Sequence, residues 1–235
     1  MISLQGALAA YAAALRPLAP QERALGDALG HVLAEDVASR VDLPMFTQSA
    51  VDGYALHSAD AAATLRVIGE IAAGTAPTLE LPRGCAARIF TGGALPAGAD
   101  TCARQEIVER IGDEIRLQKS LAVGADTRFR GEEVREGATL ARAGQRLHSG
   151  MIASLAMAGV PHVAVRPKPR IALIVTGNEV AGDSPRAGEI FDANGPLISS
   201  WLRERGYPLA SVRHVRDEPA RLRSALTEAI GESDL

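Results

Sequence analysis

The chain has 235 residues, a formal net charge of −3, 47% hydrophobic residues and 23% charged residues. This composition is ordinary for a soluble globular protein, and the length allows one large domain or two to three small ones. The small negative charge and the 3% aromatic content argue against a basic stripe or a stacking platform for nucleic acid. No run of 18 uncharged apolar residues and no secretory signal are present, so we expect a cytoplasmic protein without a membrane span.

The N-terminal segment is expected to be helical. Ser3 can cap a helix that ends near Pro17 and has one apolar face. That face consists of Leu4, Leu8, Tyr11 and Leu15. A second short helix is expected over Asp27–Leu33.

From about Asp42 the apolar runs become short and Gly and Pro become frequent, which indicates a small β-rich unit. Gly112-Asp113 between two such runs predicts a hairpin turn. Cys85 and Cys102 have no metal-ligand spacing, so we expect two reduced, partly buried thiols. The expected strands are Leu65–Ile71, Ala86–Phe90, Thr101–Val108 and Glu114–Leu117.

A helix is expected over Ser149–Ala158, with Ser149 as its cap and Gly159 as the residue that ends it. The strand-like run Val160–Val165 follows. A stiff linker, Arg166-Pro167-Lys168-Pro169, is the best boundary candidate in the chain.

After the linker the pattern is strand, helix, strand, helix, which is the opening of a doubly wound α/β sheet. The first strand is expected to be buried on both faces. Two strands leave bare sheet edges, so we expect this unit to be truncated or completed from outside the chain. The expected elements are Ile171–Val175, Pro196–Arg205, Leu209–Val215 and Glu218–Ile230, with Gly206 as a helix stop and Asp217 as a helix cap.

Several glycine-bearing turns carry polar groups. Asp52 lies beside Gly53 in a segment without a helix or strand period, which suits a carboxylate that positions a metal ion or a proton. Thr91-Gly92-Gly93 follows an expected strand, and its hydroxyl could bond a phosphate or a metal-bound water. Arg130-Gly131-Glu132-Glu133 offers one guanidinium and two acids, although a charged surface loop is the simpler interpretation.

A second group of polar residues falls at the expected strand ends of the α/β unit. Ligands bind at the carboxyl ends of strands in open α/β sheets, where Gly177 permits close approach and Glu179 could project a carboxylate. Asn194 lies at a helix start, which favours an anion, although simple capping by Asn194 remains open. Asp217 could cap its helix or, next to Glu179, help to hold a cation.

The acids Asp52, Glu133, Glu179 and Asp217 would repel an anionic ligand unless a hard cation lay between them. Mg²⁺ accepts one or two carboxylates together with substrate phosphates, and it could stabilise a departing phosphate. The histidines are scattered in the sequence, and we see no Ser-His-Asp arrangement that competes with this interpretation.

Taken together, these motifs resemble the molybdopterin molybdenumtransferase family of the MoeA type, to which the gephyrin E domain also belongs. The resemblance spans essentially the whole chain. The motifs, in the family's order, are Pro44-Met45-Phe46 with Ser49–Ala55, then Glu70–Gly74, Ile89–Gly93 with Pro96–Asp100, Arg130–Glu133, and Thr176–Glu179.

The resemblance implies that molybdate is inserted into adenylylated molybdopterin with release of AMP, assisted by Mg²⁺. It also implies an elongated homodimer, with a molybdopterin adenylyltransferase as upstream partner and an active cleft formed between two subunits. Carried over by motif, Asp52, Thr91, Glu133, Glu179 and Asp217 are the expected catalytic residues. Asp52 and Glu179 are then the expected metal ligands, and Gly92, Gly177 and Asn194 are the expected cofactor-binding positions.

The implied architecture is multidomain α/β plus β. A split elongated domain of residues 1–41 and 135–168 would dimerise, an inserted β-rich domain would cover 42–134, and an incomplete molybdopterin-binding α/β domain would cover 169–235. Val51, Glu133 and Asn178 depart from the family's usual Met, Asp and Asp. Two alternatives stay open: a non-catalytic dimerising scaffold of the same family, and a generic nucleotide-binding α/β protein.

Overall fold

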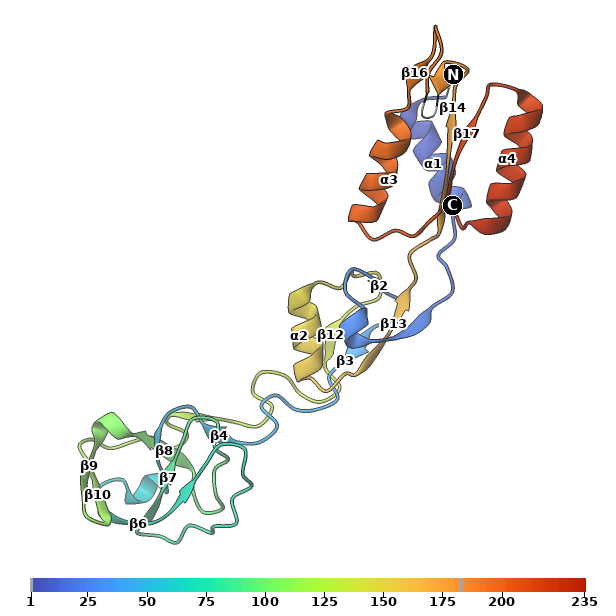
Figure 1. The fold of residues 1–235 in the computed structure, drawn as a ribbon. Helices are drawn as coiled ribbons and strands as arrows, with labels where there is room; N and C mark the ends of the chain where they lie inside the picture. Colours follow the sequence, from blue (N-terminus) through green and yellow to red (C-terminus); the bar gives the residue numbers. More distant parts are fainter. Residues whose placement is uncertain (1, 182–183) are drawn as a thin grey trace. The chain divides into compact units, whose positions relative to one another are not determined.

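A computed structural model describes residues 2–181 and 184–235, which form two compact units (Figure 1). The first unit combines residues 2–23 with Gly30–Ala34 and Ala164–Leu235, and the second combines Ala24–Leu29 with Glu35–Val163. Both units are therefore assembled from segments that are distant in the sequence. Among the described residues, none of the helices has the length and apolarity needed to cross a bilayer.

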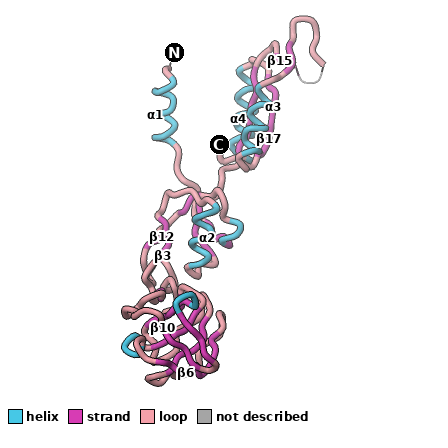
Figure 2. Tube along the Cα trace, turned by 90° about the vertical axis from the view of Figure 1, so that its left-hand side faces the viewer, coloured by secondary structure: helices cyan, strands magenta, loops and turns pink. Residues whose placement is uncertain are grey.

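The second unit is built on a six-stranded sheet with the strand order β8-β5-β7-β6-β10-β9. Figure 2 shows its strands in magenta among connecting loops. Its neighbouring strands are antiparallel except for the parallel pair β6 and β7. The strands are β5 (Gly53–Leu56), β6 (Thr64–Ile71), β7 (Cys85–Ile89), β8 (Thr101–Arg104), β9 (Val108–Ile111) and β10 (Glu114–Leu117).

The strand predictions for this unit are confirmed with one exception. The hairpin is present, because Ile111 pairs with Glu114 across Gly112-Asp113. The expected strand Thr101–Val108 is wrong in its second half, where a 3-10 helix, Gln105–Ile107, separates β8 from β9. The backbone N–H of Gln105 donates to the Asp52 carbonyl at 3.0 Å, which draws the chain out of the ladder.

The sheet is buried on both faces, because alternate residues of its central strands enter two different apolar clusters. Leu56 and Ala86 belong to one cluster, whereas Ala55, Ala87 and Cys102 belong to the other. Both cysteines are buried and free, as expected, and burial raises the pKa of the Cys102 thiol to about 11. Such a thiol is inert at neutral pH.

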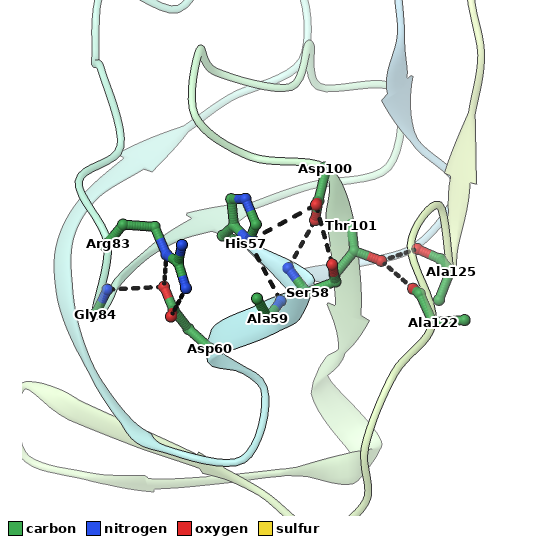
Figure 3. A network of polar contacts seen from close by, with 10 residues as sticks. All are labelled: His57, Ser58, Ala59, Asp60, Arg83, Gly84, Asp100, Thr101, Ala122 and Ala125. Carbon is green, nitrogen blue, oxygen red and sulfur yellow. Dashed lines mark hydrogen bonds and ion pairs between the residues drawn. The ribbon is translucent and has the colours of Figure 1, made fainter.

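A polar network fixes one end of this sheet (Figure 3). The carboxylate of Asp60 accepts from Arg83 Nε at 2.8 Å, from Arg83 Nη2 at 2.6 Å and from the Gly84 backbone N–H at 2.9 Å. These hydrogen bonds, with the Arg83 guanidinium first, lower the pKa of Asp60 to about 2. Asp60 thus joins a 3-10 helix, Ser58–Asp60, to the turn that precedes β7.

We expect Asp60→Asn to lower the free energy of unfolding at pH 7 by about 1–2 kcal/mol, because a charge-assisted pair is lost. The contribution of Asp60 is fully present above the unfolded pKa of about 3.9. It is lost as the pH falls through the folded value of about 2. Urea unfolding at pH 7 and pH 2.5 measures both effects, with the exposed Asp113→Asn as control. Equal stability of Asp60→Asn and Asp113→Asn at pH 7 would contradict the prediction.

Short strand pairs and one helix extend the second unit. The helix begins as expected, but its cap is His148 rather than Ser149, since His148 Nδ1 accepts from the Met151 backbone N–H at 3.3 Å. Gly159 ends the helix with a φ of 76°, as expected. The elements are β3 (Val37–Ala38) with β12 (Thr139–Ala141), β4 (Gln48–Ser49) with β11 (Thr127–Arg128), and α2 (Ser149–Met157).

A three-stranded sheet has the order β1-β13-β2, with β1 (Gln21–Ala24), β2 (Val32–Leu33) and β13 (His162–Arg166). The helix expected over Asp27–Leu33 is therefore wrong. A 3-10 turn, Leu25–Asp27, comes first, and Gly30 has a φ of 76°, a left-handed conformation that breaks a helix. Leu33 then pairs with Val165 as a buried strand residue.

The N-terminal helix α1 (Leu4–Ala14) is confirmed, and Ser3 caps it by accepting from the Gly6 backbone N–H at 3.1 Å. None of the residues of α1 is buried. Its large apolar residues are exposed, with Leu4 at 77% and Tyr11 at 61%.

In the first unit the parallel strands β14 (Ile171–Thr176) and β17 (Leu209–Val215) carry the helices α3 (Asn194–Glu204) and α4 (Pro219–Glu232). Figure 1 shows the helices on either side of the strand pair. A small parallel pair, β15 (Val180–Ala181) and β16 (Ile190–Phe191), follows β14. The predicted strand-helix-strand-helix order is confirmed.

The α/β core is small, as expected for two strands. Within β14 only Val175 is buried, so the prediction of a strand buried on both faces is wrong for the described residues. The reason is that β14 has a single neighbouring strand. Large apolar side chains of the helices remain exposed, among them Leu197, Trp201 and Ile230.

Candidate functional site

The sheet of the second unit brings Asp52 and Thr91 together. Gly53 pairs with Ile89 across β5 and β7, so the start of β5 and the end of β7 meet at one edge. There Asp52 Oδ1 accepts from the backbone N–H and from the hydroxyl of Thr91, both at 2.8 Å. Two residues 39 positions apart in the sequence therefore form one polar pair.

Hydrogen bonding keeps Asp52 ionised. The backbone N–H and the hydroxyl of Thr91 lower the pKa of Asp52, burial opposes them, and the Arg88 charge adds a smaller lowering effect. Carboxylates that accept such bonds favour the charged form. No described residue donates a hydrogen bond to Asp52 Oδ2, so this oxygen is available to a ligand.

A cavity of about 380 Å³ opens at this pair. It adds three residues that the sequence did not single out, the last residue of β8 and the first two of the 3-10 helix that follows it. Arg104 is held by the carboxylate of Asp126, and Glu106 forms no ion pair with the described residues. The cavity is lined by Val51, Asp52, Thr91, Arg104, Gln105 and Glu106.

Gly92 determines the shape of the turn and does not offer a free backbone N–H to a ligand. Its φ is 80°, a left-handed conformation that glycine adopts without strain. Its backbone N–H donates to the Ser49 carbonyl at 2.9 Å. Gly92 therefore contributes geometry to the Thr91 turn, and its predicted contact with a cofactor stays a prediction.

Glu133 is not among the residues that line the Asp52 cavity. Its carboxylate pairs with Arg128, which also holds Glu132, and its backbone N–H donates to the Leu43 carbonyl at 3.0 Å. Arg130 pairs with Asp42 at 2.7 Å. In the structure this loop is internally paired, which agrees with the simpler interpretation of a charged surface loop.

In the first unit the carboxyl ends of β14 and β17 also meet, as expected for a parallel pair. Asn178 Oδ1 accepts from the Asp217 backbone N–H at 3.1 Å, which ties the two strand-end turns together. Gly177 has a φ of 145°, and a Cβ built on it would lie 2.9 Å from Glu179 Oε1. The Glu179 carboxylate therefore lies directly over Gly177.

A cavity of about 550 Å³ lies at these strand ends and mixes both charges. Gly177 lines it, whereas Glu179, Asn194 and Asp217 are not among its lining residues. The charged and titratable groups of its lining are Arg186, Glu189, His214, Arg216, Arg221 and Glu228.

Neither Asn194 nor Asp217 caps the helix that it precedes or begins. Asp192, rather than Asn194, satisfies the start of α3, because its Oδ1 accepts from the Gly195 backbone N–H at 2.9 Å while Oδ2 lies 2.7 Å from His214 Nε2. These contacts lower the pKa of Asp192. Asp217 does not cap α4, whose cap residue is Glu218, because the Asp217 backbone is turned toward Asn178.

One cluster that the sequence did not reveal unites His57, Ser58 and Asp100 (Figure 3). The Ser58 hydroxyl donates to Asp100 Oδ2 at 3.0 Å, and His57 Nδ1 accepts from the Ala59 backbone N–H at 3.2 Å. A nucleophilic serine needs a histidine that accepts its proton. Here the serine bonds the carboxylate instead, so the cluster secures a turn.

The described residues contain no group of three His, Cys, Asp or Glu side chains that could hold a metal ion. Mg²⁺ needs only one or two protein carboxylates when substrate phosphates complete its shell. Asp52 Oδ2 fits that requirement. Asp52 and Glu179 lie in different units, each described by itself, so their joint binding of one ion stays a prediction.

Comparison with known proteins gives two family matches. Residues 2–159 match the family described as "MoeA N-terminal region (domain I and II)", and residues 172–235 match "Probable molybdopterin binding domain". A molybdopterin molybdenumtransferase of Staphylococcus epidermidis is 31% identical over 220 residues, which cover 90% of this chain and 52% of that protein. One of Nostoc is 33% identical over 215 residues, with 88% and 49% covered.

Solved structures agree with these relatives. A molybdopterin biosynthesis MoeA protein of Pyrococcus horikoshii matches with a TM-score of 0.86 and 32% identity, covering 100% of this chain and 62% of the other. A second structure of that name matches with a TM-score of 0.83 and 30% identity. The chain spans about half the length of the curated relatives it matches.

Proposed function

The chain belongs to the family of the MoeA N-terminal region, and we propose that it forms part of a molybdopterin molybdenumtransferase. In this role it would act in molybdenum cofactor biosynthesis, inserting molybdate into adenylylated molybdopterin with release of AMP. The observation that carries the proposal is the Asp52–Thr91 pair, since both residues come from family motifs and meet at a cavity.

Within the second unit, Asp52 would act as an ionised oxygen ligand. Thr91 occupies Oδ1 with two hydrogen bonds, which orients the carboxylate and leaves Oδ2 for a cation or a water molecule. With Glu179, Asp52 would hold Mg²⁺. The ion, when bound, would polarise the phosphoanhydride and neutralise charge on the departing phosphate.

Within the first unit, the strand ends of β14 and β17 would receive the phosphorylated pterin, because ligands of open α/β sheets bind there. Gly177 allows the ligand to approach the backbone, and the Asn178–Asp217 hydrogen bond holds the two turns in register. Arg186, Arg216 and Arg221 line the cavity and would offset phosphate charge. Asp217 and Glu133 remain proposed catalytic residues of the family motif.

The proposal includes a homodimer, supplied with substrate by a molybdopterin adenylyltransferase. Its support is the exposed apolar face of α1, where Leu4, Leu8, Tyr11 and Leu15 are all at least half exposed. Faces of this kind mark protein contacts more often than open surface.

The full-length protein encoded by the gene tests the function directly. We expect it to release AMP from adenylylated molybdopterin in a reaction that requires both molybdate and Mg²⁺. AMP measured by chromatography, with either component omitted as control, is the readout.

Three other results would redirect the assignment. A dimer in light scattering without affinity for pterin or nucleotide would favour the non-catalytic scaffold. ATP binding without a preference for pterin would favour a generic nucleotide-binding protein. Full AMP release without Mg²⁺ would remove the cation from the proposal.

A further inference from the structure

Arg88 is the penultimate residue of β7 and lies three positions before Thr91. It is half-buried, and its register partner on β5 is Tyr54. Its guanidinium carbon lies 5.2 Å from the centroid of the Tyr54 ring and 5.1 Å from that of Phe90. Two aromatic rings therefore confine one cation, and Phe90 is the residue that precedes Thr91.

The guanidinium also bonds both segments next to Asp52. Arg88 Nη2 donates to Gln105 Oε1 at 2.9 Å, and Nη1 donates to the Gly53 carbonyl at 3.3 Å. Gly53 follows Asp52, while the Gln105 backbone N–H donates to the Asp52 carbonyl at 3.0 Å. A single side chain thus contacts the neighbours of both site residues.

The charge of Arg88 is not neutralised within the described part of the chain. No carboxylate forms an ion pair with it, although Glu70 on β6 is its register partner, whereas Arg104, which lines the cavity, is paired with Asp126. Its field acts on Asp52 in the same direction as the Thr91 hydrogen bonds. The sheet therefore keeps an unpaired cation beside the carboxylate.

We propose that Arg88 is the positioning residue of the Asp52–Thr91 site. Its guanidinium bonds the Gly53 carbonyl next to Asp52, packs on the Phe90 ring next to Thr91, and keeps a positive charge near the carboxylate. The forked, planar group is needed because it must meet two acceptors and two ring faces at once, which a lysine ammonium cannot do. The catalytic consequence rests on the proposed function.

Two substitutions in the full-length protein separate geometry from charge. Arg88→Met removes the charge and both donors, and we expect kcat for AMP release to fall about 10- to 100-fold, as for small misplacements of reacting groups. Arg88→Lys keeps the charge without the fork, and we expect a fall of about 10-fold. Arg116→Met, an exposed arginine of β10 in the same sheet, is the control and should leave kcat unchanged.

A second readout does not depend on turnover. The pKa of Asp52, followed by ¹³C NMR of its carboxyl group, should rise in Arg88→Met and stay nearly unchanged in Arg88→Lys and Arg116→Met. A purely structural Arg88 would lower the melting temperature in Arg88→Met without moving this titration, and that result would overturn the proposal. Wild-type turnover in Arg88→Lys would also overturn the proposal. This result would decide the question even if Arg88→Met did not fold.

The two proposals can fail separately. If the wild-type protein releases no AMP, the proposed function fails, and the Asp52 titration alone decides the role of Arg88. If the wild-type protein is active but Arg88→Met has both the kcat and the Asp52 titration of the control, only the role of Arg88 is wrong.

Discussion

Asp52→Asn is expected to reduce AMP release by the full-length protein about 100-fold or more, with the melting temperature almost unchanged. The fold tolerates the change because the asparagine oxygen can still accept from the Thr91 backbone N–H and hydroxyl, as Asp52 Oδ1 does at 2.8 Å. Activity is lost because a neutral amide neither binds a hard cation well nor balances its charge.

The hydrogen bonds of Thr91 make a graded version of this test possible. Thr91→Val removes the hydroxyl donor, the second largest cause that lowers the pKa of Asp52, and keeps the backbone N–H donor, so it should raise this pKa in part. The acid limb of kcat/KM should then move to higher pH, because more of the carboxylate is protonated at each pH. Asp113→Asn, an exposed hairpin residue, is the matched control. Wild-type turnover in Asp52→Asn would show that the site has been misassigned.

Most of the secondary structure follows from local patterns. The run Glu114–Leu117 and the run Leu209–Val215 are strands with the predicted bounds. The predictions fail where a contact between residues distant in the sequence determines the local structure. Residues 27–33 look helical, but the left-handed Gly30 breaks the segment and Leu33 pairs with Val165 from 132 positions away.

Some residues of the candidate site can also be predicted from local patterns, and others cannot. Asp52, Thr91, Gly177 and Glu179 stand out because each lies in or next to a glycine-bearing turn. Arg88 does not, since it reads as an ordinary residue of a β-strand. Only the register that places it opposite Tyr54, together with the packing against Phe90, reveals its position.

Helix caps were mispredicted for a related reason. Asn194, Ser149 and Asp217 are favourable cap residues by type. The cap positions are Ala193, His148 and Glu218, of which only His148 accepts a capping hydrogen bond, while Asp192 accepts from the Gly195 backbone N–H and lies against His214. The cap preference of a residue type predicts where a helix starts to within a few residues. It does not predict which side chain bonds the first backbone N–H groups of the helix.

Gly53→Ala is expected to destabilise the second unit strongly. A Cβ at this position would lie 2.0 Å from the Ala103 carbonyl oxygen, 2.8 Å from its carbon and 3.0 Å from Arg104 Cα. All three atoms are backbone of β8, so no side-chain rotation relieves the clash. Strands β5 and β8 would have to separate, which breaks the pairing of Gly53 with Arg104.

We expect this substitution to lower the free energy of unfolding by about 3 kcal/mol or more, at the upper end of overpacking effects. Urea unfolding followed by circular dichroism measures it. Gly69→Ala is the matched control, because Gly69 lies in β6 of the same sheet and a Cβ there would meet only Leu79 Cδ2, at an ordinary 3.4 Å. That variant should be neutral or slightly more stable, since alanine restricts the unfolded chain.

The close strand approach that requires glycine at position 53 also links the stability of the sheet to the geometry of the Asp52 site. Close approach of β5 to β8 brings Gln105, which follows β8, within hydrogen-bonding distance of the Asp52 carbonyl, and Arg88 bonds both Gln105 and Gly53. A folded Gly53→Ala protein should therefore lose AMP release as well as stability. If Gly53→Ala matched Gly69→Ala in both stability and turnover, close contact between β5 and β8 would not be what positions Asp52.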